Sequence, residues 1–333
     1  MKRLKISVLI LVALLITTSC GSPQIDNSSE IVVTDQIGRI IKLDAPAERI
    51  VSSYYPATSI LLALGLHNNI VGIETGADTR KLYSLAAPEI INLPSVNSGN
   101  GINIEEASAL RPDMVILPKR LSDSVVAFEE LGIAAVVINP ETLDGFLNCV
   151  SILGKLTGRE ETAEKLEKYY NDKINEINKL TKVAEKPRVY FAAGSSYLST
   201  CTGGMYQADM IKTAGGICVS ENLSGGSFAA IDREQLISWN PRYIFVANYA
   251  EYDINDIKRD KALSQIEAIL KRDINIFPSE IEAWDSPSSS SILGFLYLTN
   301  KLHPTLLSKE DYIKEVERFY REFFGIIIST KGL

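Results

Sequence analysis

Short β-branched runs alternate with stretches of helical periodicity along most of this sequence, in two successive halves. The strands expected from this alternation are Ile50–Ser52, Ile70–Ile73, Met114–Leu117, Ala135–Ile138, Arg188–Ala192, Tyr243–Ala247 and Ile274–Phe277. The helices expected between them include Thr58–Leu64, Ser124–Leu131, Asp209–Ala214, Ala262–Leu270 and Ser291–Leu302. Strands separated by helices are joined by crossover connections, so this order predicts parallel sheets covered by helices.

The most polar helical pattern, at 160–181, lies between the two halves. Its apolar residues recur every three or four positions and form one stripe: Ala163, Leu166, Tyr170, Ile174 and Ile177. A helix of this length rises about 33 Å, which is enough to run from one domain to another. With 333 residues and 46% hydrophobic content, the chain can bury two cores. We therefore expect an α/β protein of two Rossmann-like lobes with mainly parallel sheets, bridged by a single long α-helix.

The expected boundaries follow from these patterns. The N-terminal α/β lobe should occupy residues 31–156, the interlobe helix 157–186 and the C-terminal α/β lobe 187–333. Before them, MKRLK and an apolar run end in TTSC at 17–20, which is typical of a bacterial lipoprotein signal although Thr17 stands where leucine is usual. We expect a signal peptide at 1–19 and a lipidated tether at 20–30 that begins with Cys20. Simple secretory cleavage and an uncleaved anchor are the alternatives.

One short sequence occurs in both halves. INIEEASALRPDMVI at 102–116 aligns without a gap with IDREQLISWNPRYIF at 231–245. Each copy predicts a short helix with a glutamate near its start, Glu105 or Glu234, and a proline before the next strand. A helix–proline–strand junction is common in α/β proteins, so the match alone does not establish a duplication. The frequency of such junctions does not explain, however, why an exposed glutamate recurs among apolar neighbours.

Composition and missing motifs exclude several function classes. The net charge of −7 is spread along the chain, so no basic stripe could follow a nucleic-acid backbone. No nucleophile elbow, P-loop or dinucleotide-binding glycine motif is present. The two histidines, His67 and His303, fall at expected surface turns, so a site for a bare transition-metal ion is not predicted. Cys149, Cys201 and Cys218 lack metal-ligand spacing; buried thiols and a disulfide between Cys201 and Cys218 both remain open.

Aromatic and basic residues gather where loops should leave the carboxyl ends of strands, which is where open α/β sheets bind ligands. The candidate cleft residues are Tyr54, Tyr55, Lys119 and Arg120 in the first half, and Tyr197, Tyr249 and Trp284 in the second. Two such sets facing each other would suit a large, partly planar or chelated ligand. A packing or surface role explains any single residue equally well, so the set as a whole supports the prediction.

In the order and spacing of its segments, the mature sequence resembles the substrate-binding lipoproteins of bacterial ABC importers for iron-siderophores, haem and cobalamin. The segments that carry the resemblance are VVTDQIGRIIKLDAPAERIVSS at 32–53, GINIEEASALRPDMVI at 101–116, LGIAAVVI at 131–138, LGKLTGREETAEKL at 153–166 and FPSEIEAWDSPSSSSILGFLYLTNKLHP at 277–304. The resemblance implies the two-lobed fold predicted above and a monomeric, extracytoplasmic receptor anchored to the cell membrane. It implies no catalysis, and a bridging helix that permits only small closure on the ligand.

The resemblance also implies roles for individual residues. In the family, a glutamate on each lobe docks onto arginines of the membrane permease, and the matching positions here are Glu105 and Glu234. Tyr54, Tyr55, Tyr197 and Trp284 occupy matching cleft loops, and Lys119 and Arg120 could meet an anionic chelate. The expected partners are therefore an ABC permease and its ATPase.

The ligand expected from these arguments is a chelated metal, since the scarcity of histidine favours a metal already held by an organic chelator. A ferric siderophore comes first, and a corrinoid, haem or an oxyanion such as molybdate are alternatives. No cofactor is expected. Two hypotheses from other classes remain: a two-lobed cleft enzyme of chelatase-like architecture, which would need convergent catalytic groups, and a sensor that signals occupancy to a partner other than a permease.

Overall fold

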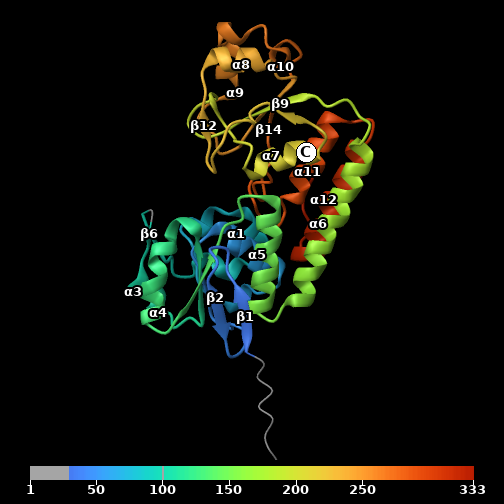
Figure 1. Ribbon diagram of the computed structural model, residues 1–333. Coiled ribbons are helices and arrows are strands. Elements are labelled where there is room, and N and C mark those ends of the chain that lie inside the picture. The colour runs from blue at the N-terminus through green and yellow to red at the C-terminus, as the bar shows by residue number, and fades with distance from the viewer. Residues whose placement is uncertain (1–29, 100) are drawn as a thin grey trace, which may run out of the picture.

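The computed structural model describes residues 30–99 and 101–333 (Figure 1). The predicted signal peptide and the lipidation of Cys20 lie outside the described residues. The described chain forms two α/β lobes, and α6 (Glu160–Thr181) runs along one side from one lobe to the other (Figure 1). The predicted fold class is thereby confirmed, with the bridging helix at the predicted residues.

The N-terminal lobe contains a four-stranded parallel sheet in the order β4–β3–β7–β8. Its strands are β3 (Ile50–Ser52), β4 (Ile70–Gly72), β7 (Met114–Pro118) and β8 (Ala134–Ile138). Helices α1 (Tyr55–Ala63) and α5 (Leu143–Leu156) cover one face, and α3 (Ile104–Ala109) and α4 (Val125–Glu130) cover the other. The remaining elements are β1 (Ile31–Thr34), β2 (Ile40–Leu43), α2 (Lys81–Ala86), β5 (Asn97–Ser98) and β6 (Gly101–Ile102). Because both faces are covered, the strands are nearly continuous apolar runs.

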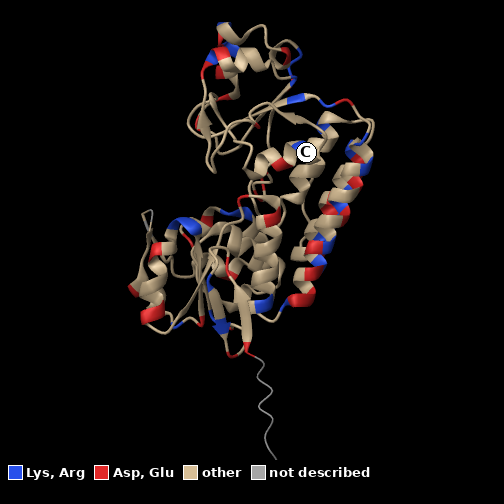
Figure 2. Ribbon diagram, in the orientation of Figure 1, with Lys and Arg blue, Asp and Glu red and all other residues tan. Residues whose placement is uncertain are grey.

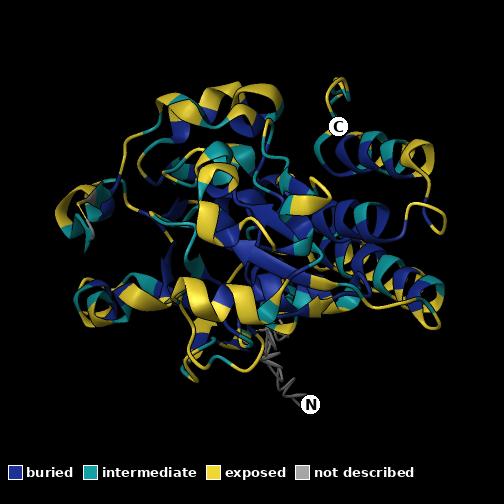
Figure 3. Cartoon of the chain, turned by 90° about the horizontal axis from the view of Figure 1, so that it is seen from above, coloured by how far each residue is buried: buried dark blue, intermediate teal, exposed yellow. Residues whose placement is uncertain are grey.

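The C-terminal lobe is built around a mixed sheet in the order β12–β10–β9–β13–β14, in which the three predicted strands run parallel. Its strands are β9 (Arg188–Ala192), β10 (Ser199–Thr200), β11 (Ile217–Cys218), β12 (Ala229–Ala230), β13 (Tyr243–Val246) and β14 (Ile274–Ile276). Its helices are α7 (Tyr206–Thr213), α8 (Arg233–Trp239), α9 (Ile254–Arg259), α10 (Glu267–Leu270) and α11 (Ile292–Leu302). Figure 3 shows buried strands enclosed by partly exposed helices.

One predicted helix is broken. The expected helix Ala262–Leu270 is a 3-10 turn at Lys261–Leu263 followed by α10. Between the two pieces, Ile266 has an extended backbone, and its side chain is buried in the core of the C-terminal lobe. Placing this side chain in the core therefore interrupts the helix that the periodicity predicts.

The last helix, α12 (Lys309–Phe324), was not predicted and lies beside α6 (Figure 1). The ring centroids of Tyr169 on α6 and Phe319 on α12 are 5.4 Å apart, and the Tyr169 hydroxyl donates to Glu315 at 3.0 Å. On its other side α6 approaches α5 closely, since a Cβ added to Gly154 would lie 2.5 Å from that of Ala163. One continuous apolar core therefore links both lobes through α6, α11 and α12. Basic and acidic residues alternate along the outer face of α6 (Figure 2).

The two copies of the repeated sequence have the same local structure. Asn103 caps α3 and Asp232 caps α8, and each side chain accepts a hydrogen bond from the backbone N–H three residues on. Glu105 and Glu234 therefore occupy the same position in the first turn of their helices, and both are exposed.

The ends of the two repeated helices also match. Arg111 and Asn240, each just before the proline, have left-handed backbones with φ of 49° and 42°. The side chain of Arg49 donates to the carbonyl of Arg111 at 3.0 Å, and that of Arg188 donates to the carbonyl of Trp239 at 2.7 Å. The sequence repeat is thus a structural repeat, in which an arginine at the start of a parallel strand holds the end of the helix: Arg49 directly precedes β3, and Arg188 is the first residue of β9.

Candidate ligand-binding cleft

Three adjoining recesses lie between the lobes, at the carboxyl ends of the parallel strands. The first, of about 540 Å³, is lined by Tyr54, Tyr55, Arg80, Asn97, Arg120 and Ser286, among others. The second, of about 410 Å³, shares Tyr55, Arg80 and Ser286 with it and extends to Tyr249. The third, of about 370 Å³, shares Tyr54 and Arg120 and extends to Lys119 and Glu141. Because neighbouring recesses share residues, we treat them as one interlobe cleft.

Arg80 lies where the first two recesses meet. The central carbon of its guanidinium group is 3.7 Å from the centroid of the Tyr55 ring, in cation–π geometry. Its Nε is 3.5 Å from Oε1 of Glu74. The ring and the carboxylate hold the guanidinium group in place at the wall of the cleft. Arg80 was not among the predicted residues: the loop after β4 contains no aromatic residue, and its one arginine lies at the end of the loop, beside α2.

Glu74 is a buried carboxylate behind Arg80, with 5% of its surface exposed. It accepts hydrogen bonds of 2.6 Å from the hydroxyls of Thr58 and Tyr83. Burial raises the pKa of Glu74, and these two hydrogen bonds and the charge of Arg80 act in the opposite direction. This network fixes Glu74 inside the N-terminal lobe and so makes it a rigid support for Arg80.

Tyr54, Lys119 and Arg120 lie along the same wall of the cleft, as the sequence predicted. The Tyr54 hydroxyl donates to Oε1 of Glu141 at 3.1 Å. Burial, followed by the charge of Glu141, raises the pKa of Tyr54 above its ordinary value, so the phenol stays protonated. The side chains of Lys119 and Arg120 are exposed at the third recess.

Of the three predicted residues in the C-terminal lobe, only Tyr249 lines these recesses. It is 45% exposed, and burial of its hydroxyl, followed by the charge of Asp285, raises the pKa of the phenol. Tyr197 lies elsewhere: its hydroxyl donates to Asp260 at 2.8 Å and accepts a hydrogen bond from Arg233 at 3.0 Å. These contacts direct the Tyr197 side chain toward α8 and away from the recesses.

Trp284 is a correction to the predicted set. Its side chain is only 3% exposed, and its indole N–H donates to the hydroxyl of Tyr320 at 2.9 Å. The Trp284 ring also meets the Tyr312 ring edge-on, with centroids 6.3 Å apart. Both partners belong to α12, which the sequence analysis did not predict. A large aromatic side chain beside the apolar face of a helix is more stable buried there than exposed in the cleft.

The serine run after Trp284, which comprises Ser286 and Ser288–Ser291, connects the lobes. Ser286 lines the cleft, and the backbone N–H of Ser289 donates to Oγ of Ser59 in the N-terminal lobe at 3.0 Å. The Tyr170 hydroxyl on α6 donates to the carbonyl of Ser289 at 2.9 Å and accepts from the N–H of Ile292 at 3.1 Å. Small side chains permit this close packing at the floor of the cleft.

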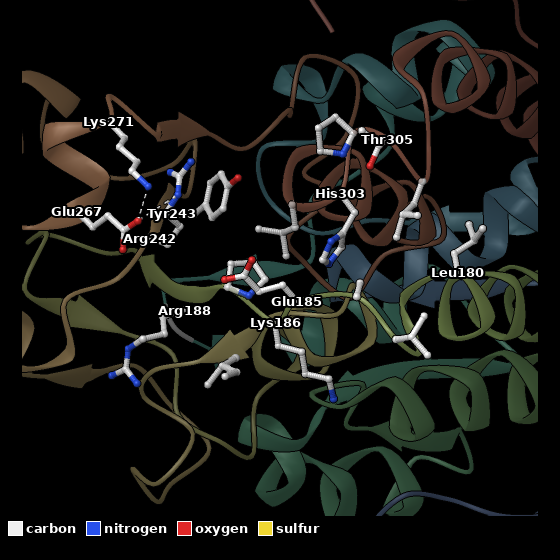
Figure 4. Close-up of a pocket in the computed structure, with 17 residues that line it drawn as sticks. Leu180, Glu185, Lys186, Arg188, Arg242, Tyr243, Glu267, Lys271, His303 and Thr305 are labelled. Atoms are coloured by element: carbon white, nitrogen blue, oxygen red, sulfur yellow. Dashed lines mark hydrogen bonds and ion pairs between the residues drawn. The ribbon is translucent and has the colours of Figure 1, made fainter.

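A larger recess, of about 840 Å³, lies outside the cleft at the opposite ends of β9 and β13 (Figure 4). Among its charged side chains, Arg242 contacts Glu267 and the neighbouring Asp273, and Lys271 lies 2.7 Å from Glu267. His303 faces this recess and is 8% exposed, so its expected surface position is wrong; burial lowers the pKa of its imidazole. Since parallel sheets bind ligands at the carboxyl ends of their strands, we place the site in the interlobe cleft.

Glu105 and Glu234 do not line the recesses of the cleft: they belong to α3, which lies at the side of the N-terminal lobe opposite α6, and to α8, at the far end of the C-terminal lobe (Figure 1). In the part of the chain that the structure describes, no group of three or more His, Cys, Asp and Glu residues could hold a metal ion. Within the same residues, no helix has the length and apolar character needed to cross a membrane.

Comparison with known proteins gives consistent matches. A family model described as periplasmic binding protein matches residues 50–281. The molybdate-binding protein MolA of Haemophilus influenzae is 24% identical, and the match covers 94% of this chain and 96% of that protein. A vitamin B12-binding protein of Yersinia pestis is 25% identical, over 60% of this chain and 70% of its own length.

Two solved structures have the same fold. A periplasmic solute binding protein from Veillonella parvula matches with a TM-score of 0.78 and 26% identity, covering 90% of this chain and 94% of that chain. The structure of MolA bound to molybdate matches with a TM-score of 0.79 and 22% identity, covering 90% of this chain and 99% of that chain.

Proposed function

This chain belongs to the periplasmic binding protein family, and we propose that it captures an anionic metal chelate between its lobes and delivers it to an ABC importer. Binding and release, with no catalytic step, are the mechanism. A ferric siderophore is the ligand that we test first. The protein would work outside the cytoplasm, held at the membrane through a lipid on Cys20.

The observation that carries this proposal is Arg80. Its guanidinium group is held on the Tyr55 ring where two recesses meet, and Arg120 lines the same cleft. Two guanidinium groups on one wall favour a ligand with several anionic oxygens, because each can donate paired hydrogen bonds to such oxygens. The amino end of α1 follows β3 at this edge of the sheet, and its partial positive charge adds to the attraction.

The aromatic residues of the cleft support a chelate over a bare ion. Tyr54, Tyr55 and Tyr249 line the cleft, and aromatic side chains suit a planar or partly apolar ligand. The combined recesses can also hold a molecule of several rings. A small oxyanion such as molybdate is the second candidate, because MolA, which is named for that ligand, matches nearly the whole of this chain.

Calorimetric titration with a ligand panel tests the proposal. The panel contains ferric catecholate and hydroxamate siderophores, cobalamin, haem, molybdate and the bare ferric ion. We expect one anionic chelate to bind with micromolar affinity or better, and Arg80→Gln to weaken that binding about 10- to 100-fold, because a charge-assisted contact is lost. Arg259→Gln, an exposed arginine on α9, serves as the control and should leave the affinity unchanged.

Each alternative has a distinct result in the same titration. Tight binding of molybdate alone would favour the second candidate, with Arg80 still required. Tight binding of a ligand that carries no anionic group would contradict an anion site at Arg80. An Arg80→Gln variant that binds as well as the wild type would contradict it too.

We also propose that Glu105 and Glu234 dock the loaded protein onto cationic side chains of the permease. Their equivalent, exposed positions on α3 and α8 support this role. Two charged contacts far apart on the surface would fix the orientation of the complex and steer encounter more than they would add affinity.

A further inference from the structure

Cys201 and Cys218 meet at the edge of the C-terminal sheet. β13 occupies one edge of β9, so β10 and β11 share the other. β10 pairs near the end of β9 and runs antiparallel to it, whereas β11 pairs near its start and runs parallel. Cys201 follows β10 and Cys218 ends β11, so the two strands bring the cysteines together from opposite directions.

The two sulfur atoms are 3.9 Å apart, and both residues are fully buried. The hydroxyl of Ser220 lies 3.3 Å from the sulfur of Cys218 and 3.8 Å from that of Cys201. A disulfide has a sulfur separation of about 2.05 Å, so the bond would bring the two sulfur atoms closer than they are in the reduced pair. Cys149 lies apart from this pair and donates to Oε1 of Gln36.

We propose that Cys201 and Cys218 form an intramolecular disulfide bond once the chain has been exported. The inference rests on the extracytoplasmic location proposed above, since disulfides form and persist in oxidising compartments. The bond would join residues 17 positions apart and close a loop that contains α7. It would also link β10 to β11, the two strands that share one edge of β9. It would thereby hold β10 and β11 together at this edge of the sheet, as well as constrain the unfolded chain.

The oxidant is a protein thiol oxidoreductase that carries a disulfide. The thiolate of one of the two cysteines attacks that disulfide and forms a mixed disulfide, and the thiolate of the other then displaces the oxidoreductase. The two thiols lose two electrons and two protons in total, and the oxidoreductase leaves as a dithiol. Since both sulfurs are buried in the fold, the reaction takes place before the edge strands have packed.

The experiment uses the full chain exported with its own leader into an oxidising bacterial compartment. Cells are quenched in acid, the protein is unfolded, free thiols are blocked with N-ethylmaleimide, and peptides are mapped by mass spectrometry. We expect a linked peptide pair containing Cys201 and Cys218 that separates after reduction, with Cys149 blocked. Cys149→Ser, the matched control, should keep the linked pair. Blocked, unlinked Cys201 and Cys218 in the wild-type chain would overturn the proposal.

Thermal unfolding provides a second measurement. It compares the wild type with two variants, so the conclusion does not depend on whether one variant folds. A reductant should lower the melting temperature of the wild type and of Cys149→Ser. It should leave unchanged that of the double variant Cys201→Ser/Cys218→Ser. Equal shifts in all three would also overturn the proposal. Titration with the ligand panel on the same samples separates the two questions: free thiols in protein that binds its ligand would refute the disulfide and leave the proposed function standing.

Discussion

Asp285 is fully buried beside the serine run, and Gln207 donates to its backbone carbonyl at 2.8 Å. Burial raises the pKa of the Asp285 carboxyl to about 7. An aspartate in the unfolded chain has a pKa of about 3.9. Between these values the folded protein keeps a proton that the unfolded chain has released, so this residue makes the fold less stable as pH rises from 4 to 7.

Asp285→Asn should remove this contribution. We expect the variant to gain stability over the wild type between pH 4 and pH 8, by on the order of 2–4 kcal/mol, because a neutral amide incurs no cost of ionisation. Urea unfolding at a series of pH values measures the difference. The exposed Asp78→Asn serves as the control and should show no such trend. Stability differences that stay constant from pH 4 to pH 8 would show that Asp285 does not titrate in this range.

Individual side chains were the hardest feature to predict, and Arg80 and Trp284 show why. A strand has a period of two and a helix of 3.6, so the buried face of either can be read from sequence. The loops that form the cleft have no such period. The sequence placed Trp284 after the last strand, but its direction is set by contacts with α12. Arg80 becomes a site residue through Tyr55 and Glu74, which lie 25 and 6 residues away in the sequence.

At the scale of elements, the sequence was more informative. All seven expected strands were found within one residue of their predicted ends, because most of them are short apolar runs buried between helices. The apolar stripe of α12, at Tyr312, Val316, Phe319, Tyr320 and Phe323, was also present in the sequence and was overlooked. That α12 packs against α6 could not have been deduced, since each helix has an apolar face that could pack against any other apolar surface.

The repeated helices α3 and α8 allow a direct test of the docking proposal. Reversing the charges with Glu105→Lys and Glu234→Lys should reduce ligand uptake by cells at least 10-fold and leave the affinity for the ligand unchanged, because both residues are exposed and neither lines the cleft. Uptake assays and calorimetry on the same variants measure the two quantities. Glu106→Lys, the adjacent exposed residue on α3, is the control and should have little effect. Equal loss of affinity would instead assign the glutamates to ligand binding.

For the whole molecule, two lobes and a bridging helix followed from the sequence, but the way they are fastened together did not. Contacts between the lobes come from segments far apart in the chain. The backbone N–H of Leu82 donates to the carbonyl of Ile281 at 3.1 Å, and that of Leu143 donates to Asp209 at 3.2 Å. Together with the shared apolar core, these contacts resist hinge motion more than a single bridging helix would.

Ligand binding should therefore change the radius of gyration by less than about 1 Å, as measured by small-angle X-ray scattering with and without the ligand. Tyr170 provides the sharpest test, because its hydroxyl joins α6 to the serine run through Ser289 and Ile292. Tyr170→Phe should loosen the lobes, giving faster hydrogen exchange at 288–292 and a larger change on binding. Tyr312→Phe is the matched control, since it removes a buried hydroxyl that has no hydrogen-bond partner among the described residues. A large closure of the wild type would contradict this prediction, because it would show that ligand binding overcomes the contacts between the lobes.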